Sequence, residues 1–415
     1  MQRESVKNIF HSEIVEDRAF ERRNWVDVTA SNFILDTEQQ PSEIIFSTQQ
    51  LKENYLLPAD AYIRFKLHFY KVHDAATTPI VAGDLAQLRN GSMSIFDNIE
   101  IQVGDQDNKI EELRCTEHWG NIEHIMYHSK SEDLAHQGYE LPKSNAVTRS
   151  SLLHNNEMFV YVYLRNIPFF RHWDGLLTKT KFRLCMRPNY NKIVSNNDST
   201  SFKISRAELF IPEVILLPEY RAKVLQKFNN GASKRLLWQS VDTYQSQLFS
   251  NNTTNVHWNI SSEIKKPSWV YFVLSSGENI GKGSQILYNT WDIQSYAVSV
   301  NNKEVFFENS ISFVGKNAMK LYENLRRKQQ QTFSEASIIS YIEFCSMYRI
   351  LCFNLEDCDA ASVYNSRGDS SVSLSLRMTI SAVNKPLTIH CFVEREKEIS
   401  INYKSDRVEL GFAQL

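Results

Sequence analysis

The sequence predicts an all-β fold made of two tandem eight-stranded jelly rolls, with short helical insertions and an inter-domain helix. Runs of alternating apolar and polar side chains dominate the chain, and the order of these runs repeats once. At 415 residues the chain is also longer than a single core usually supports. With 42% apolar and 12% aromatic residues, its composition is that of a folded protein rich in strand formers.

Strand patterns fill both halves of the chain. The clearest has Ile63, Phe65, Leu67 and Phe69 alternating with polar side chains, which places one apolar face against a core. Within the run at 207–217, Pro212 predicts an edge strand or a bulge. The remaining runs cover residues 99–103, 158–166 and 180–187 in the first half, and 238–249, 255–260, 268–275, 296–307, 348–355, 371–380 and 387–394 in the second.

The same series of elements occurs twice in one order. SIFDNIEIQVGDQDNKIEEL (94–113) and IQSYAVSVNNKEVFFEN (293–309) both read as strand, polar turn and strand, and a helical pattern follows each. The two helices share the spacing i, i+4, i+7, i+11, and a later strand in each half alternates in the same way. The matching residues are Cys115, Trp119, Ile122 and Met126 with Val314, Ala318, Leu321 and Leu325, then Phe182, Leu184 and Met186 with Leu374, Leu376 and Met378. This shared order predicts a tandem duplication.

One helical segment divides the two copies. Pro218 followed by EYRAKVLQKF predicts a helix that begins at a proline and ends at the glycine of NNGAS. The expected organisation is an N-terminal arm (1–23), a first jelly roll (24–217), a linker helix (218–233) and a second jelly roll (234–415). The alternative is a pair of immunoglobulin-like or fibronectin-like sandwiches, which are smaller and lack helical insertions of this kind.

Charge and cysteine content restrict the expected partners and compartment. The 46 basic and 48 acidic side chains give a net charge of -2, so no long-range field attracts nucleic acid or an anionic membrane. The chain has no apolar run that would serve as a secretory signal or a membrane span, so we expect it not to be secreted. Its six cysteines are scattered, as reduced core thiols would be: Cys115, Cys185, Cys345, Cys352, Cys358 and Cys391.

Two patterns imitate known sites. GENIGKGS (277–284) resembles a phosphate-binding loop, but its spacer is one residue short and glycine follows the lysine, so we interpret it as a surface loop. His124 and His128 lie four residues apart beside Glu123, but HIMYH lacks the glutamate of the HExxH zinc helix. We expect these histidines on the polar face of a core-packed helix.

Two charged segments are interpreted as solvated. Glu111 and Glu112 are neighbours on a strand, so their side chains point to opposite faces and cannot flank one substrate bond. The run RRKQQQ (326–331) is expected just past the second helix as its basic, exposed end, with contact to nucleic acid as the alternative. The sequence therefore predicts no catalytic, cofactor-binding or metal-binding residue and no cofactor.

Several segments resemble the double jelly-roll major capsid proteins of polinton-like and adintovirus-like elements, which belong to the adenovirus-hexon-like lineage. Residues 94–132 resemble that family's strand, turn and strand before a helix, and FFRHWDGLLTKTKFRLCMRPNYNKIV with KISRAELFIPEVILLPEYRAKVLQKF resembles its closing strands and inter-domain helix. In the second half the resemblance is carried by YAVSVNNKEV and YRILCFNLED. It covers roughly residues 25–405.

The resemblance implies a structural protein of a virion, made in the host cytoplasm or nucleus. Three chains would form a pseudo-hexagonal homotrimer that tiles an icosahedral shell beside other capsomers, penton proteins and minor capsid proteins. It implies that the arm (1–23) contacts neighbours, an internal membrane or packaged DNA, that 128–157 and 308–345 are exposed or inter-subunit loops, and that no small-molecule substrate is bound. The competing hypotheses are a tandem jelly-roll glycan amidase or glycosidase and a carbohydrate-binding pair, with Trp173, Trp258, Trp269 and Trp291 as candidate sugar platforms.

Overall fold

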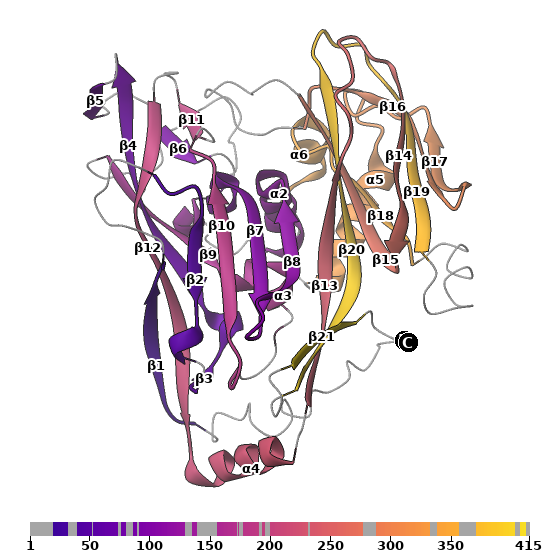
Figure 1. Cartoon of the computed structure of the whole chain (residues 1–415). Coiled ribbons are helices and arrows are strands. Elements are labelled where there is room, and N and C mark those ends of the chain that lie inside the picture. Colours follow the sequence, from indigo (N-terminus) through magenta and orange to yellow (C-terminus); the bar gives the residue numbers. More distant parts are fainter. Residues whose placement is uncertain are drawn as a thin grey trace.

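The computed structural model shows two β-sandwiches joined in tandem (Figure 1). It describes residues 20–411 except 32–39, 52, 74–75, 80–85, 89–90, 129–134, 139–155, 172, 174–176, 191–192, 196–199, 231–232, 277–287, 333–337, 357–370 and 403–406. The loop GENIGKGS, residues 1–19 of the expected arm, Cys358 and the glycine expected to end the linker helix lie outside the described residues.

The first sandwich, here the first roll, has two main sheets. One has the order β1-β12-β4-β5, with β3 also pairing β12 and β9 pairing β4, and the other has the order β2-β10-β7-β8. A two-stranded sheet of β6 and β11 accompanies them. The strands are β1 (Phe20–Thr29), β2 (Ile44–Ser47), β3 (Tyr55–Leu56), β4 (Tyr62–His73), β5 (Ala76–Pro79), β6 (Ala86–Leu88), β7 (Phe96–Val103), β8 (Asn108–Arg114), β9 (Glu157–Tyr163), β10 (Phe182–Pro188), β11 (Ile193–Ser195) and β12 (Thr200–Leu216).

The second sandwich, the second roll, repeats this arrangement. Its sheets have the orders β13-β20-β15-β18, with β21 pairing β20, and β14-β19-β16-β17. The strands are β13 (Ser233–Gln245), β14 (Asn255–Lys265), β15 (Pro267–Ser276), β16 (Ile293–Val300), β17 (Lys303–Asn309), β18 (Leu351–Asn354), β19 (Ser371–Ile380), β20 (Leu387–Asn402) and β21 (Arg407–Gly411).

The two rolls share one topology. If β1, β2, β4, β7, β8, β9, β10 and β12 are counted as eight strands in chain order, and β13 to β20 likewise, the sheets of both rolls read 1-8-3-6 and 2-7-4-5. This is the order of a jelly roll, in which distant strands close the sandwich. The repeated strand-turn-strand motif lies at the same place in both copies, as β7–β8 and β16–β17. The predicted duplication and fold class are confirmed.

In the described part of the chain, five α-helices accompany the sheets: α2 (Thr116–Tyr127), α3 (Pro168–Arg171), α4 (Pro218–Asn229), α5 (Met319–Thr332) and α6 (Tyr341–Ser346). Helix α2 follows β8 in the first roll, and α5 follows β17 in the second, as the repeat predicts. Helix α4 begins at Pro218 and links β12 to β13 at the lower end of the molecule (Figure 1). None of the described helices combines the length and apolar character that a membrane crossing requires.

Three expectations about local structure were wrong. Residues 308–345 are not one loop, because they contain α5 and most of α6. Val314 does not share the buried face of α5: it precedes the helix and is 70% exposed. Strand β1 begins at Phe20, so the last residues of the expected arm already pair with β12.

Pro212 lies on an internal strand rather than on an edge or at a bulge. Strand β12 runs between β1 and β4, and Pro212 faces Trp25 of β1 without a register shift. On its other side, pairing with β4 ends at Phe210 and pairing with β3 begins at Glu213. The proline thus occupies the gap between two partner strands, where its missing N–H breaks no ladder bond on that side.

The cores consist of the alternating side chains that the sequence indicated. Ile63, Phe65, Leu67 and Phe69 of β4 are all fully buried. Of the five described cysteines, four are buried and Cys115 is partly exposed, and all five are free thiols. Burial raises the pKa of the Cys352 and Cys391 thiols well above the ordinary range, so neither is an activated nucleophile.

Candidate functional site: the interface between the two rolls

The first roll packs against one sheet of the second, and we call this contact the inter-roll interface. Helix α2 and strand β8 of the first roll face β13, β20 and β15 of the second (Figure 1). The Trp119 ring of α2 lies 6.2 Å from the Tyr271 ring and 5.8 Å from the Phe392 ring, and Phe169 of α3 meets Trp238 edge-on at 5.2 Å. Aromatic contacts of this kind make the interface resemble a core.

Helix α2 is held between the rolls by its first turns. Cys115, just before the helix, adopts a left-handed conformation with φ 52°, and the Thr116 hydroxyl donates to the Phe96 carbonyl oxygen. At Gly120 the backbone of the short 3-10 helix Ser92–Ile95 comes so close that an added Cβ would lie 2.8 Å from Met93 Cβ. Because both rolls cover it, α2 is buried nearly all round rather than on one face.

A buried ion pair of the second roll lies at this interface and binds a tyrosine of the first roll. Lys328 Nζ of α5 lies 2.6 Å from Glu394 Oε2 of β20, and the two residues are only 3% and 1% exposed. The Tyr127 hydroxyl of α2 donates to Glu394 Oε1 at 2.6 Å, and the Tyr271 hydroxyl of β15 donates to the same atom at 3.0 Å. Burial alone would raise the pKa of Glu394, but Lys328 and the two phenols outweigh it and hold that pKa below its usual range.

This pair overturns the interpretation of residues 326–331 as a solvated helix end. The segment lies inside α5 rather than past it, and Lys328 and Gln329 are buried. Gln329 Nε2 donates to the Ile125 carbonyl oxygen of α2 at 2.7 Å, so α5 also contacts the first roll. The sequence carried a signal for this, because Lys328 lies three residues after Leu325 and seven after Leu321, on the apolar stripe of the helix.

Glu111 is buried at the interface, so its interpretation as a solvated turn residue was wrong. Its carboxylate on β8 accepts hydrogen bonds from Trp238 Nε1 at 2.6 Å, the Ser240 hydroxyl at 2.8 Å and the Val241 backbone N–H at 3.2 Å, all on β13. Burial raises the pKa of this carboxyl group, with Lys397 and the three donors acting against the rise. Glu111 lies two residues before the core residue Leu113 and therefore on the same face of the strand. This spacing was the signal in the sequence that Glu111 is buried.

An open groove of about 470 Å³ borders the interface beside Glu111. Glu112 and Asp242 also line it, so three carboxylates come together where the sequence predicted none. Glu112 is paired with Arg114 at 2.8 Å and Lys109 at 2.6 Å, and hydrogen bonding to Arg114 is the main cause that lowers its pKa to about 2. Asp242 Oδ2 lies 2.6 Å from Arg395 Nε. Each carboxylate in the groove thus has fixed partners.

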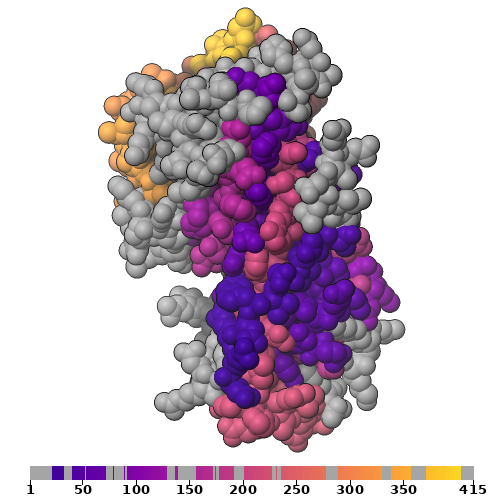
Figure 2. Space-filling model, turned by 90° about the vertical axis from the view of Figure 1, so that its left-hand side faces the viewer, coloured from indigo at the N-terminus to yellow at the C-terminus, as the bar shows by residue number. Residues whose placement is uncertain are grey.

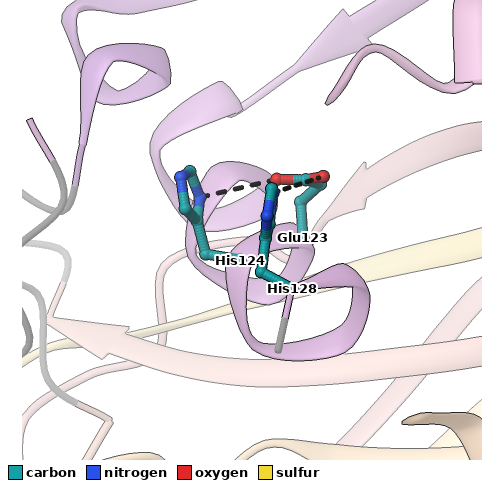
Figure 3. A group of neighbouring side chains, drawn as sticks. All are labelled: Glu123, His124 and His128. Carbon is teal, nitrogen blue, oxygen red and sulfur yellow. Dashed lines mark ion pairs between the residues drawn. The ribbon is translucent and has the colours of Figure 1, made fainter. Parts of the chain in front are cut away.

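Two histidines and a glutamate gather at the end of α2 (Figure 3). His128 Nε2 and His124 Nδ1 each lie 3.5 Å from an oxygen of Glu123, and the two imidazole rings stack 5.2 Å apart beside the carboxylate. Arg171 Nη2 of α3 is 3.1 Å from Glu123 Oε1, and its guanidinium lies 3.5 Å from the centre of the Tyr127 ring. The histidines were expected on the polar face of a core-packed helix, and in the structure both are buried.

The donor set of this cluster favours an ionic network over a metal site. His124 Nδ1 lies 2.5 Å from the Gly120 carbonyl oxygen, so this nitrogen carries the hydrogen of that bond and presents no lone pair. The Arg171 guanidinium already holds one oxygen of Glu123, and it would repel a cation. Burial opposes ionisation of Glu123, but His128, His124 and Arg171 outweigh it and lower the pKa of this carboxyl group to about 2.

Two further histidines meet across the interface. The ring of His118 on α2 lies 4.2 Å from the ring of His390 on β20. His118 Nδ1 is 3.2 Å from the Tyr288 hydroxyl, and His390 Nε2 is 2.9 Å from the Ser275 hydroxyl. The inter-roll interface therefore combines aromatic packing with titratable groups that are held in place by both rolls.

Comparison with known proteins gives matches in structure alone. No family model matches the chain, and no curated protein matches its sequence. Among solved structures, the capsid of the virus PBCV-1 matches with a TM-score of 0.59 at 9% identity, covering 96% of this chain and 99% of that one.

Two further solved structures match to a similar degree. The mavirus major capsid protein has a TM-score of 0.59 at 9% identity, covering 97% of this chain and 91% of that one. The Sputnik virophage structure has a TM-score of 0.58 at 11% identity, covering 96% and 90%. The fold of this chain is therefore the double jelly roll of viral major capsid proteins.

Proposed function

We propose that this chain is a major capsid protein that forms homotrimers, each a pseudo-hexagonal capsomer of an icosahedral shell. The observation that carries the proposal is the inter-roll interface, which fuses two like rolls into one rigid block with its ionic groups sealed inside. Three such blocks around a threefold axis place six similar rolls in a ring, which tiles a surface with closed symmetry. The shared fold over almost the whole length of known capsid proteins supports the same function.

The proposed role is structural rather than enzymatic. Among the described residues, the groove beside Glu111 is the feature that favours a glycan-cleaving enzyme, because such enzymes use a pair of carboxyl groups. Glu111 accepts three hydrogen bonds and Glu112 forms two ion pairs, so neither is poised to give a proton to a sugar. A glycan-release assay on the purified protein tests this point, and cleavage that is lost in Glu111→Gln would favour the enzyme.

The carbohydrate-binding alternative requires exposed aromatic platforms. Trp173, Trp269 and Trp291 are at most 3% exposed, and Trp258 is partly buried against the core. Side chains in these positions serve packing and have little free ring face for a sugar.

The finer expectations about partners and lineage stay within this proposal. Penton proteins, minor capsid proteins and neighbouring capsomers would contact the outer faces of the trimer inside the virion. An internal membrane or packaged DNA would meet the N-terminal arm, whose first 19 residues lie outside the described part of the chain. A polinton-like or adintovirus-like origin remains a proposal from the sequence resemblance.

Analytical ultracentrifugation of the purified chain tests the function. The expected species has three times the chain mass of 48.3 kDa, and negative-stain images should show pseudo-hexagonal particles. A protein that remains monomeric at micromolar concentration would contradict the proposal, because obligate capsomer interfaces bury more than about 2,000 Å².

A further inference from the structure

The contact between the two rolls is asymmetric. The first roll contributes the hairpin β7–β8 and helix α2, whereas the second contributes the outer side of the sheet β13-β20-β15-β18. Because both rolls have the same topology, each also has a counterpart of the surface that the other contributes. The C-terminal part of α5 already contacts α2 inside the chain, through Gln329 and Ile125. The first roll has the equivalent sheet β1-β12-β4-β9, and the second has the equivalent hairpin β16–β17 followed by α5.

Burial along the equivalent strands shows which surface is covered. Strand β15 of the second roll is buried at every residue from Pro267 to Ser275, so both of its faces are packed. Its counterpart β4 alternates strictly, with Ile63 to Phe69 buried at every second residue and the intervening side chains partly exposed. On this outer side of the first roll, the short 3-10 helix Ala135–Gln137 packs over part of β9, with the His136 ring 5.5 Å from the Tyr163 ring and 6.2 Å from the Tyr161 ring. Trp25 and Phe159 stay exposed on the same side. Figure 2 looks at the side on which β1 and β12 lie, and shows indigo and pink residues at the surface.

The outer side of the first roll is aromatic, and we call it the aromatic face: Trp25, Tyr62, Arg64, Phe159 and Phe210. The Tyr62 and Phe210 rings stack at 5.2 Å, Trp25 lies 5.3 Å from Tyr62, and the Arg64 guanidinium lies 4.8 Å from the centre of the Phe210 ring. Trp25 is 51% exposed and Phe159 is 43% exposed. Tyrosine, tryptophan and arginine are the residues that dominate binding energy in protein interfaces.

The second roll carries an apolar surface on its equivalent segment, here the β17–α6 surface: Phe307, Val314, Met319 and Ile342. Each of these side chains is more than half exposed. Phe307 lies on β17 and Met319 is the first residue of α5, at the end of the helix that does not contact the first roll. Of the nine large apolar side chains that are exposed in the described part of the chain, six lie on the aromatic face or on this surface.

We propose that these two surfaces bind each other between copies of this chain. The aromatic face of one copy receives the β17–α6 surface of the next, and thereby repeats the joint that already exists inside each chain. The occupant is a second copy because the intrachain contact shows that a hairpin and helix at this place in the topology pack against a sheet of this kind, and the second roll carries the corresponding hairpin and helix. Such a contact is heterologous, because it joins two different surfaces. If each roll is rotated by one sixth of a full turn relative to the preceding roll, the six rolls of three chains close into a ring. The inference rests on the proposed trimer and specifies its interface.

Three variants test the interface. Trp25→Ser/Phe159→Ser removes apolar area from the aromatic face, and Phe307→Ser/Ile342→Ser removes it from the β17–α6 surface. Leu248→Ser is the matched control, because Leu248 is 61% exposed but lies on neither surface. Circular dichroism and thermal unfolding establish that each variant is folded before its mass is measured by ultracentrifugation.

Each double variant should raise the concentration for half-assembly by at least about 30-fold, as loss of a hot-spot side chain does, whereas Leu248→Ser should assemble like the wild type. A mixture of the two double variants is diagnostic. Each retains the surface that the other has lost, so they should form a one-to-one dimer through one intact joint and no closed trimer.

The outcomes separate this inference from the proposed function. A wild-type trimer whose double variants also form trimers at the same concentration would overturn the inference and leave the capsid function standing. A wild-type monomer would overturn both. If a double variant does not fold, radical footprinting of the wild type replaces it: Trp25 and Phe159 should be protected in the trimer relative to the diluted monomer, and equal labelling would refute the interface.

Discussion

Replacing Lys328 with methionine should lower the free energy of unfolding by about 3–5 kcal/mol, the cost of removing one partner from a buried ion pair. Methionine keeps an apolar stem near the Trp269 and Tyr127 rings, which lie 5.1 and 5.5 Å from Lys328 Nζ, so little packing is lost. The loss arises because Glu394 would keep only its hydrogen bonds from Tyr127 and Tyr271 while it remains buried.

The same substitution should reverse the pH dependence that Glu394 contributes. In the wild type the folded-state pKa of Glu394 is lowered, so its stabilisation is present above the ordinary pKa of 4.5 and is lost as the pH falls. Without Lys328 the burial effect prevails and raises the folded-state pKa. The carboxyl group of the variant then favours folding when protonated, so the deficit relative to wild type should shrink between pH 7 and pH 5.

Urea unfolding followed by tryptophan fluorescence at one fixed protein concentration measures both effects. Lys320→Met on the same helix is the control, since Lys320 is exposed and lies 3.9 Å from Glu308, an arrangement worth less than about 1 kcal/mol. The double variant Lys328→Met/Glu394→Gln should recover most of the loss because no unpaired charge remains. A loss below about 1 kcal/mol in the single variant, or no recovery in the double, would refute the reasoning.

Substitutions at three other positions test the cluster at the end of α2, the close packing of this helix at Gly120 and the turn between β16 and β17. In the wild type, the carboxyl pKa of about 2 means that Glu123 stabilises the fold above the ordinary value of 4.5 and that this contribution is lost as the pH falls from there toward 2. Glu123→Gln should remove that acid-dependent step in a circular dichroism titration, and an unchanged profile would contradict the pairing with Arg171 and the histidines. Gly120→Ala should destabilise by about 1–3 kcal/mol despite the better helix propensity of alanine, because the new Cβ would meet Met93 Cβ. Thermal unfolding measures the change in stability. A variant more stable than the wild type would show that Met93 moves away from the new Cβ at little cost. Asn301 and Asn302 have φ values of 51° and 63°, so Asn302→Gly should preserve stability or improve it, whereas Asn302→Val should cost about 1–2 kcal/mol. Equal urea midpoints for the glycine and valine variants would exclude this turn geometry.

The strands, the duplication and the fold class could be predicted from the sequence because they depend on local periodicity. The alternation in β4 and the polar turn between β16 and β17 each require only neighbouring residues to be compared. The contrast between alternating β4 and the continuous apolar run in β15 also carried information, since a run without alternation is typical of a strand buried on both faces.

The polar groups of the inter-roll interface could not be predicted in the same way. Glu111 and Lys328 are buried by partners 127 and 66 residues away, and His124 is buried by a second covering layer. A single charged residue in a pattern is usually solvated. Position on an apolar stripe was the only local hint for Glu111 and Lys328. For Glu123, His124 and His128 no local hint existed, because α2 is covered on its polar side as well.

A sheet that is packed on both faces also constrains how the protein is made. The ribosome releases the first roll before the strands β13, β15 and β20 exist, so α2 is already in place to cover the sheet that emerges later. A second roll produced alone would expose Tyr271, Phe392 and their neighbours to water as an aggregation-prone apolar surface. Because the first roll comes first along the chain, we expect α2 to cover this sheet as soon as its strands emerge, and a chain with the two halves exchanged to aggregate more during synthesis.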